Sequence, residues 1–297
     1  MTFNRWSRTL IDFTKLSLVR AGYHTRPAFL VIGAQKAGTS ALWRYLSFHP
    51  QTVATTIKEI GFFHQDEVYA RGVGWYHFHF PLPHRLGPDQ VTYEATPEYL
   101  YYRKCAARMC RYDPDLRLIV LLRDPVDRAY SAWYMFPRLF ANHRENMLAI
   151  AALADGSSRE WLHRMLSGEE YPSFEDAATW EMAQIAKPDA ASEPSWLRRG
   201  IYADQLACLF EHFDRAQVLV LDSQLLRHDT GRVLDEVCHF LHLRQHSWSP
   251  DQLKPVGVQQ YRQSPSDKTR EMLIDFFRPH NRKLFELLGR TFEWQSG

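Results

Sequence analysis

The chain has 297 residues, of which 45% are hydrophobic and 24% are charged, so it can bury the core of one large α/β domain or two small ones. Its formal net charge of +2 is too small to favour nucleic acid as a partner. The four cysteines are scattered without metal-ligand spacing, which predicts reduced thiols and a cytoplasmic location. No run of 18 apolar residues occurs, so no transmembrane helix is expected.

Residues 2–26 form the first predicted element. Apolar side chains recur there at steps of three and four, which is typical of one face of a helix, and the other positions carry several Arg and Lys residues against a single acid, Asp12. Two interpretations remain open: a helix that packs on the protein's own surface, which we favour, and a helix that docks on a membrane or a partner. We assign residues 1–26 to an N-terminal amphipathic helical extension and residues 27–297 to a single domain.

The most informative stretch covers residues 29–42. An apolar run of strand length stops at Gly33, and a helical pattern resumes after Gly38, with Lys36 inside the loop and hydroxyls at Thr39 and Ser40. A strand, a Gly-bounded loop and a helix start are the layout of a phosphate-binding loop, where unpaired amides and the helix dipole attract an anion. In a nucleotide-triphosphatase loop, Lys would stand where Thr39 does, so the pattern favours a phosphate-like ligand bound without a metal. The alternative is a structural Gly-rich turn.

Residues 52–55 are short and β-branched and predict a strand, and Glu59 follows it closely. A carboxylate beyond the carboxyl end of a strand, close to a phosphate loop, is placed to act as a general base. Taken alone, Glu59 is better interpreted as a solvated surface acid. The aromatic and His-rich residues 72–81 contain His77 and His79, but no third ligand at a metal spacing, so a packed aromatic segment is expected there.

Residues 117–122 form a near-continuous apolar run, which is typical of a strand buried on both faces of a parallel sheet. Arg123 follows this strand, Pro125 is expected to open a helix, and Ser131 lies two turns further along. An Arg fork and a hydroxyl together make a second anion site. An ion pair between Arg123 and Asp127 is the alternative.

The remaining pattern alternates strands and helices. Strands are predicted at 91–96 and 217–221, and helices at 97–109, 200–213, 229–241 and 268–288. Residues 249–266 are expected to form a polar loop. Residues 137–194 have a mixed composition and are expected to face the acceptor or to form a lid. This alternation predicts an α/β protein: a P-loop-type three-layer fold with a central parallel sheet flanked by helices.

These motifs resemble those of sulfotransferases that use 3′-phosphoadenylyl sulfate (PAPS), and most closely those of the heparan sulfate N- and 3-O-sulfotransferase branch. The resemblance runs from about residue 29 to residue 294 and rests on residues 33–40, 58–63, 74–76, 94–97, 123–131, 218–222, 279–281 and 289–294, in the family's order. It makes residues 27–297 a sulfotransferase domain. It implies that the sulfuryl group moves in line from PAPS to a hydroxyl or amine, that the product is 3′-phosphoadenosine 5′-phosphate (PAP), and that no metal is required.

The resemblance also implies roles for individual residues. Glu59 would be the general base, and Lys36 would neutralise charge on the leaving oxygen. The residues expected to bind PAPS are Lys36, Ala37, Gly38, Thr39, Ser40, Arg123, Ser131 and Arg262. His143 lies in a region where related N-sulfotransferases carry a His, but we expect it to be a surface residue.

Departures from the family pattern concern the acceptor. Ala95 stands where the glycan enzymes usually carry Lys, and residues 249–266 contain no Cys for their disulfide-closed loop. We therefore expect a soluble bacterial relative whose acceptor, a carbohydrate or another small or carrier-bound alcohol or amine, need not be heparan sulfate. Two other classes remain open: a metal-dependent P-loop kinase or NTPase, and a non-catalytic nucleotide-binding module.

Overall fold

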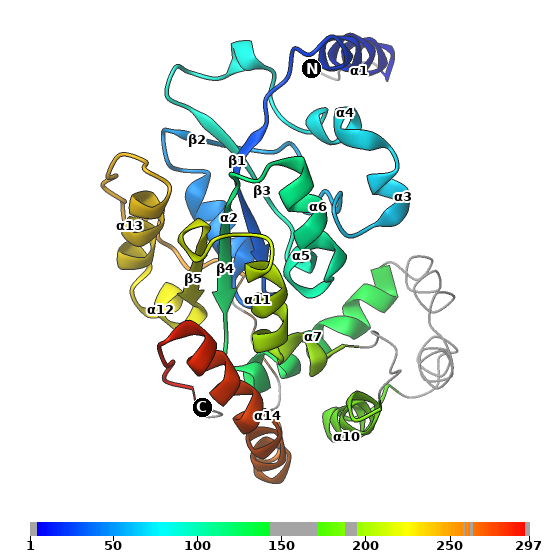
Figure 1. Ribbon diagram of the computed structural model, residues 1–297, viewed down its shortest axis with the longest axis vertical. Helices are drawn as coiled ribbons and strands as arrows, with labels where there is room; N and C mark the ends of the chain where they lie inside the picture. Colours follow the sequence, from blue (N-terminus) through cyan, green and yellow to red (C-terminus); the bar gives the residue numbers. More distant parts are fainter. Residues whose placement is uncertain are drawn as a thin grey trace. The chain divides into compact units, whose positions relative to one another are not determined.

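The computed structural model describes residues 5–142, 171–187, 195–257, 259, 261 and 264–294. The chain divides into two compact units, one of Met1–Leu122 with Gln205–Val258 and the other of Arg123–Asp204 with Gln259–Gly297. Figure 1 shows the elements of both units along the chain. Two residues singled out in the sequence, His143 and Arg262, lie outside the described residues.

The first unit is built on a parallel sheet of five strands in the order β2-β3-β1-β4-β5. The strands are β1 (Pro27–Gly33), β2 (Thr52–Ala54), β3 (Val91–Ala95), β4 (Arg117–Leu122) and β5 (Val218–Asp222). The central strands β1 and β4 pair in register from Phe29 with Arg117 to Val31 with Ile119, and the side chains of Phe29–Ile32 and Leu118–Leu122 are fully buried. The apolar run at 117–122 is therefore the doubly buried strand that its composition predicted.

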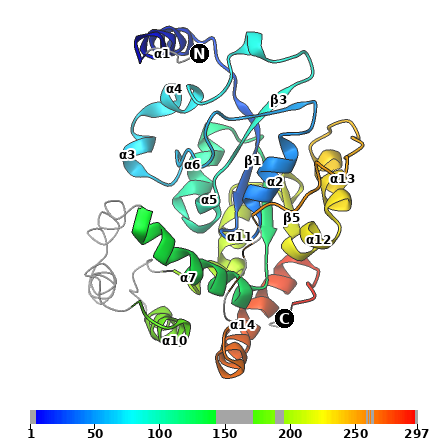
Figure 2. The ribbon, with the colours of Figure 1, turned by 180° about the vertical axis from the view of Figure 1, so that it is seen from behind.

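Helices cover both faces of this sheet. The chain leaves β1 toward the β2 edge and later passes from β3 to β4 in the opposite direction, and right-handed crossovers then place the connecting helices on opposite faces. Accordingly α2 lies on one face and α5 and α6 lie on the other (Figures 1 and 2). The helices of this unit are α1 (Arg5–Arg20), α2 (Thr39–Leu46), α3 (Asp66–Tyr69), α4 (Gly72–His77), α5 (Glu98–Tyr101), α6 (Lys104–Tyr112), α12 (Ser223–His228) and α13 (Thr230–Phe240).

The second unit is helical in its described residues. Its helices are α7 (Pro125–Asn142), α10 (Phe174–Ile185) and α14 (Asp267–Leu288), while α11 (Tyr202–Phe210) begins in this unit and ends in the first. Val126 and Ala129 from α7, Phe174 from α10 and Leu273 and Phe277 from α14 meet in one buried cluster. The α/β fold class expected from the sequence is thus confirmed, with helices around a central parallel sheet.

The structure differs from the sequence-based prediction at two helices. The single helix expected at 97–109 is two helices, because Tyr102 has extended backbone and ends α5 before α6 begins. The helix α12 was not predicted; it starts directly after β5, where the side chain of Asp222 accepts a hydrogen bond from the amide of Gln224 at 2.8 Å. Among the described helices, none is both long and apolar enough to cross a membrane.

Candidate active site

The predicted phosphate loop joins the carboxyl end of β1 to the start of α2. Its backbone turns through two left-handed residues, Lys36 with φ of 68° and Gly38 with φ of 101°, and Gly38 immediately precedes the helix. The loop is tied to the sheet by the amide of Ala34, which donates to the carbonyl of Leu121 in β4 at 2.7 Å. The eight-residue helix α2 therefore starts at the carboxyl end of the sheet. Its first amides have no partner within the helix.

The side chains of this loop suit an anion. Lys36 is half-buried and carries a positive charge, Thr39 is buried at the first position of α2, and Ser40 is exposed. The loop begins at a close approach, since a Cβ on Gly33 would lie 2.6 Å from the Cβ of Leu100 in α5. The loop is thus a compact turn that combines a cation, hydroxyls and a helix start, which is the chemistry of a phosphate or sulfate site.

Glu59 lies at the same edge of the sheet as this loop, anchored to a strand that the sequence did not suggest. Its amide donates to the carbonyl of Ala95 at the end of β3, at 3.2 Å, and Ala95 pairs with Val31 of β1. The side chain is 48% exposed and forms an ion pair with Lys58. A carboxylate that is open to solvent is within reach of an acceptor whose proton it could take.

Glu94, one residue before the end of β3, is an acid whose surroundings sequence reasoning missed. It is fully buried and accepts hydrogen bonds from the hydroxyls of Tyr76 at 2.5 Å, Thr96 at 2.5 Å and Tyr99 at 2.9 Å. Burial raises the pKa of Glu94, and these donors oppose that rise. The signals available in the sequence were the motif at residues 94–97 and an acid in an otherwise buried strand, with several Tyr nearby.

The second unit holds the other predicted anion-binding residues. Arg123 and Ser131 are buried, and the carbonyl of Arg123 accepts a hydrogen bond from the hydroxyl of Tyr202 at 2.8 Å. The start of α7 is capped by Asp124, whose carboxylate accepts from the amide of Val126 at 2.9 Å. This cap orients the backbone from which both Arg123 and Ser131 project.

The charges around α7 were only partly predictable. Asp127, which the sequence offered as an ion-pair partner for Arg123, forms an ion pair with Arg270 of α14 at 3.0 Å. Arg128 is completely buried, and this burial lowers the pKa of its guanidinium to about 10, so the group stays charged at neutral pH. The first turn of α7 therefore holds one buried cation, Arg128, beside an acid, Asp127, that is paired with α14.

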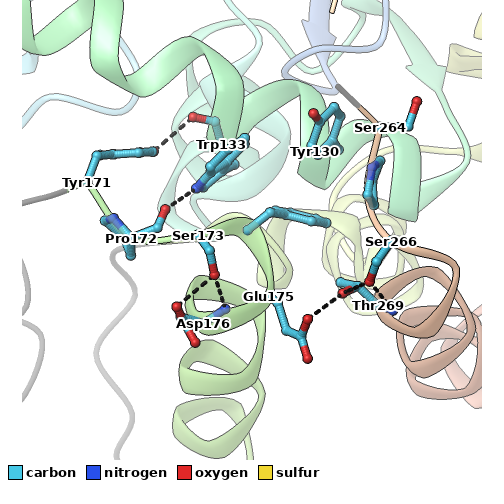
Figure 3. A pocket seen from close by; sticks show the side chains of 12 residues that line it. Tyr130, Trp133, Tyr171, Pro172, Ser173, Glu175, Asp176, Ser264, Ser266 and Thr269 are labelled. Atoms are coloured by element: carbon cyan, nitrogen blue, oxygen red, sulfur yellow. Dashed lines mark hydrogen bonds between the residues drawn. The ribbon is translucent and has the colours of Figure 1, made fainter. Parts of the chain in front are cut away.

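A hollow of about 790 Å³ also opens in the second unit, between α7, the start of α10 and the start of α14 (Figure 3). Of the predicted donor residues that the structure describes, none lines it. Its polar groups bond to one another: the Trp133 indole donates to the carbonyl of Pro172 at 3.0 Å, and the Thr269 hydroxyl donates to Glu175 at 3.2 Å. Because its aromatic rings also belong to the hydrophobic core of the unit, we assign this hollow no role in the site.

The family model of the sulfotransferase domain matches residues 26–286. The chain therefore belongs to the sulfotransferase family, and the class of enzyme expected from the sequence is confirmed. The matched range includes the phosphate loop, Glu59, Glu94, Arg123 and Ser131.

Particular relatives agree with this family. The chain is 30% identical over 289 residues to the human bifunctional heparan sulfate N-deacetylase/N-sulfotransferase 3, covering 89% of this chain and 30% of that protein. It is 29% identical to the mouse heparan sulfate glucosamine 3-O-sulfotransferase 3B1, covering 92% of this chain and 66% of that protein. The chain thus spans about a third of the length of the bifunctional relatives.

Among solved structures, a sulfotransferase from Alicyclobacillus acidocaldarius is similar, with a TM-score of 0.63 and 26% identity. The similarity covers 90% of this chain and 98% of the bacterial one. The fold of the chain is therefore also that of a bacterial sulfotransferase of about the same extent.

Proposed function

We propose that this protein transfers the sulfuryl group of PAPS to a hydroxyl or amine of a carbohydrate or another small or carrier-bound acceptor. The observation that carries the proposal is the loop between β1 and α2, in which Lys36 and Gly38 adopt left-handed backbone in front of a helix start, in a chain of the sulfotransferase family. The relatives' names support a carbohydrate acceptor, since one denotes N-sulfation and the other 3-O-sulfation of heparan sulfate.

The proposed donor contacts follow the chemistry of each group. The loop amides, the Lys36 ammonium and the two hydroxyls of α2 bind the 5′-phosphosulfate, and Arg123 and Ser131 bind the 3′-phosphate that distinguishes PAPS from ATP. The full set of donor-binding residues is Lys36, Ala37, Gly38, Thr39, Ser40, Arg123, Ser131 and Arg262. No metal is needed in this proposal, because the transferred sulfuryl group carries less charge than a phosphoryl group.

In the transfer step, the acceptor oxygen or nitrogen forms a bond to sulfur while the bond from sulfur to the 5′-phosphate oxygen breaks. Glu59 takes the proton that the acceptor loses, and Lys36 neutralises the charge that develops on the departing phosphate oxygen. The exposure of the Glu59 carboxylate and its ion pair with Lys58 support this role, because the base must be ionised and within reach of the acceptor.

Glu59→Gln tests the base directly. General-base catalysis contributes roughly 10²–10⁴-fold, so we expect kcat to fall by about that factor while PAP affinity stays within about twofold. Glu211→Gln is the matched control, because Glu211 is an exposed acid of the same unit that has no place in the proposed site. An unchanged kcat in Glu59→Gln would remove Glu59 from the mechanism.

Two measurements test the function itself. Calorimetric titration with PAP, beside ATP with magnesium, should show metal-independent PAP binding and much weaker ATP binding; the opposite preference would favour the kinase or NTPase class. Incubation with PAPS labelled in its sulfuryl group should then transfer label to desulfated heparin, which offers both hydroxyls and amines. PAP binding without transfer to this or any other acceptor would favour the non-catalytic module.

Three further predictions remain proposals. We treat residues 27–297 as one sulfotransferase domain, supported by a family match that spans both compact units. For residues 2–26, docking on a membrane or a partner is supported by the 66% exposure of Phe13. Packing on the protein's own surface is supported by the burial of Val19 and by Lys15, which lies 4.9 Å from the ring centre of Phe78 in the same unit. A cytoplasmic location is likewise a prediction.

A further inference from the structure

The turn that presents Glu59 has an unusual backbone. Glu59 has φ of 63° and Gly61 has φ of 77°, and a non-glycine residue adopts this left-handed conformation only when its surroundings compensate for the strain. Two contacts tie this turn to the end of β3 and its surroundings: the amide of Glu59 donates to the carbonyl of Ala95 at 3.2 Å, and the ring of Phe63 packs on those of Tyr76 and Tyr99, which bond to Glu94. The end of β3 therefore holds the conformation of the residue that carries the proposed base.

The carboxylate of Glu94 is itself held from three directions. Tyr76 donates to one oxygen from α4, while Thr96 and Tyr99 donate to the other from the segment that leads into α5 and from α5 itself. The two oxygens of this buried side chain thus share three hydroxyl donors. A buried carboxyl group held in this way is rigid, because losing any one donor would leave a buried polar group less satisfied.

The three hydroxyls are equally committed to this carboxylate. Tyr76 and Tyr99 are fully buried within the aromatic cluster around Phe63, whose ring centre lies 5.3 Å from that of Tyr76 and 5.2 Å from that of Tyr99. The turn is also attached at its far end, since the carbonyl of Phe63 accepts from the Arg108 guanidinium of α6 at 3.0 Å. The network thus joins the core of the unit to the turn at residues 59–63.

We propose that Glu94 is a positioning residue for sulfuryl transfer: through the end of β3 and the rings of Tyr76 and Tyr99 that pack on Phe63, it fixes the left-handed turn that presents the Glu59 carboxylate to the acceptor. Glu94 is inaccessible to substrate and acts only through this turn. The inference rests on the proposed role of Glu59 as the general base. It predicts that loosening the side chain of Glu94 lowers kcat with little change in donor binding, because the phosphate loop has its own bonds, from the Ala34 amide to Leu121 of β4 and from the Gln35 side chain to Glu98 of α5.

The test compares Glu94→Gln, Glu59→Gln and the double variant with the wild-type full chain. In Glu94→Gln, amide hydrogen exchange of residues 58–63 should become at least about tenfold faster, because the hydroxyls of Tyr76 and Tyr99, whose rings pack on Phe63, lose their carboxylate acceptor. Transfer from PAPS to desulfated heparin should show a kcat about ten- to a hundredfold lower, with PAP affinity within about twofold of wild type. Adding Glu94→Gln to Glu59→Gln should cost less than about threefold more, since a residue that acts through Glu59 has little effect once the base is gone.

Tyr99→Phe is the milder variant in case Glu94→Gln does not fold, because it removes one donor and leaves the carboxylate in place; smaller changes in the same directions are expected. Glu211→Gln serves as the control and should match wild type in every measurement.

Unchanged exchange of residues 58–63 would overturn the inference, whatever the activity. So would a full additional loss of kcat in the double variant, which would indicate a merely structural role. If neither Glu59→Gln nor Glu94→Gln lowers kcat, the base assignment fails and the inference fails with it; a defect in Glu59→Gln alone overturns only the inference.

Discussion

Replacement of Gly38 by alanine should weaken the phosphate loop by a predictable amount. A Cβ at this position would meet only Leu226 at 3.4 Å and Ser223 at 3.8 Å, which is ordinary contact distance, so space does not limit the substitution. The cost comes from the backbone, because φ is 101° and an L-residue in the left-handed region is strained by roughly 1–2 kcal/mol. The chain must either keep the loop and bear this strain, or relax the loop and lose the arrangement of its amides.

Calorimetry and thermal unfolding distinguish these two responses. If the loop is kept, the free energy of unfolding falls by about 1–2 kcal/mol; if it relaxes, PAP affinity falls by up to about tenfold, since about 1.4 kcal/mol equals one factor of ten. Gly38→Asn should cost less than Gly38→Ala, because Asn tolerates left-handed backbone better. Gly231→Ala is the matched control, with open space and no left-handed strain at the start of α13. Unfolding and PAP binding that both equal wild type in Gly38→Ala would refute this account of the loop.

Three further outcomes are expected. Arg123→Ala should weaken PAP binding but scarcely affect 5′-AMP, because it removes the cation assigned to the 3′-phosphate; equal losses for both nucleotides, measured by calorimetry, would contradict that assignment. Gly33→Ala should lower the free energy of unfolding by about 1–3 kcal/mol in urea titrations, because its Cβ would lie 2.6 Å from Leu100, whereas Gly74→Ala, in open space within α4, should be neutral or slightly stabilising. Burial lowers the pKa of His77 from 6.5 to about 4. The stability that this neutral ring contributes is therefore complete above about pH 6.5 and is lost as the pH falls toward 4. Over that window the urea midpoint of His77→Gln should fall less than that of the wild type.

The phosphate loop could be predicted because its signals are local. A strand of apolar residues, two glycines five positions apart and a helical pattern are properties of consecutive residues, and the left-handed backbone at Gly38 is a conformation that glycine adopts readily. The strand β4 was equally clear, since an apolar run of this length fits a strand buried on both faces. The assignment of the family rested on several such motifs in order, and the family model confirmed it.

The helix break at Tyr102 shows where local patterns stop. The apolar spacing of residues 97–109 suits one helix, but in the folded chain Tyr102 has extended backbone and its ring stacks on His64, with ring centres 5.6 Å apart. A partner 38 positions away along the chain cannot be read from helical periodicity. Such a contact overrides local propensity because burying an aromatic ring outweighs the small intrinsic preference for helix.

The sequence by itself therefore determined the family, the α/β alternation and the glycine-bounded loop after β1, while the residues expected to touch PAPS stay a prediction. Tertiary structure alone decided the strand order β2-β3-β1-β4-β5, the anchoring of Glu59 to the end of β3, and the burial of Glu94. The physical reason is that a periodic pattern encodes which face of an element is buried, whereas hydrogen bonds between separate elements depend on which buried faces meet. Glu94, Tyr76 and Tyr99 come from three such elements, and only the folded chain brings their polar groups within bonding distance.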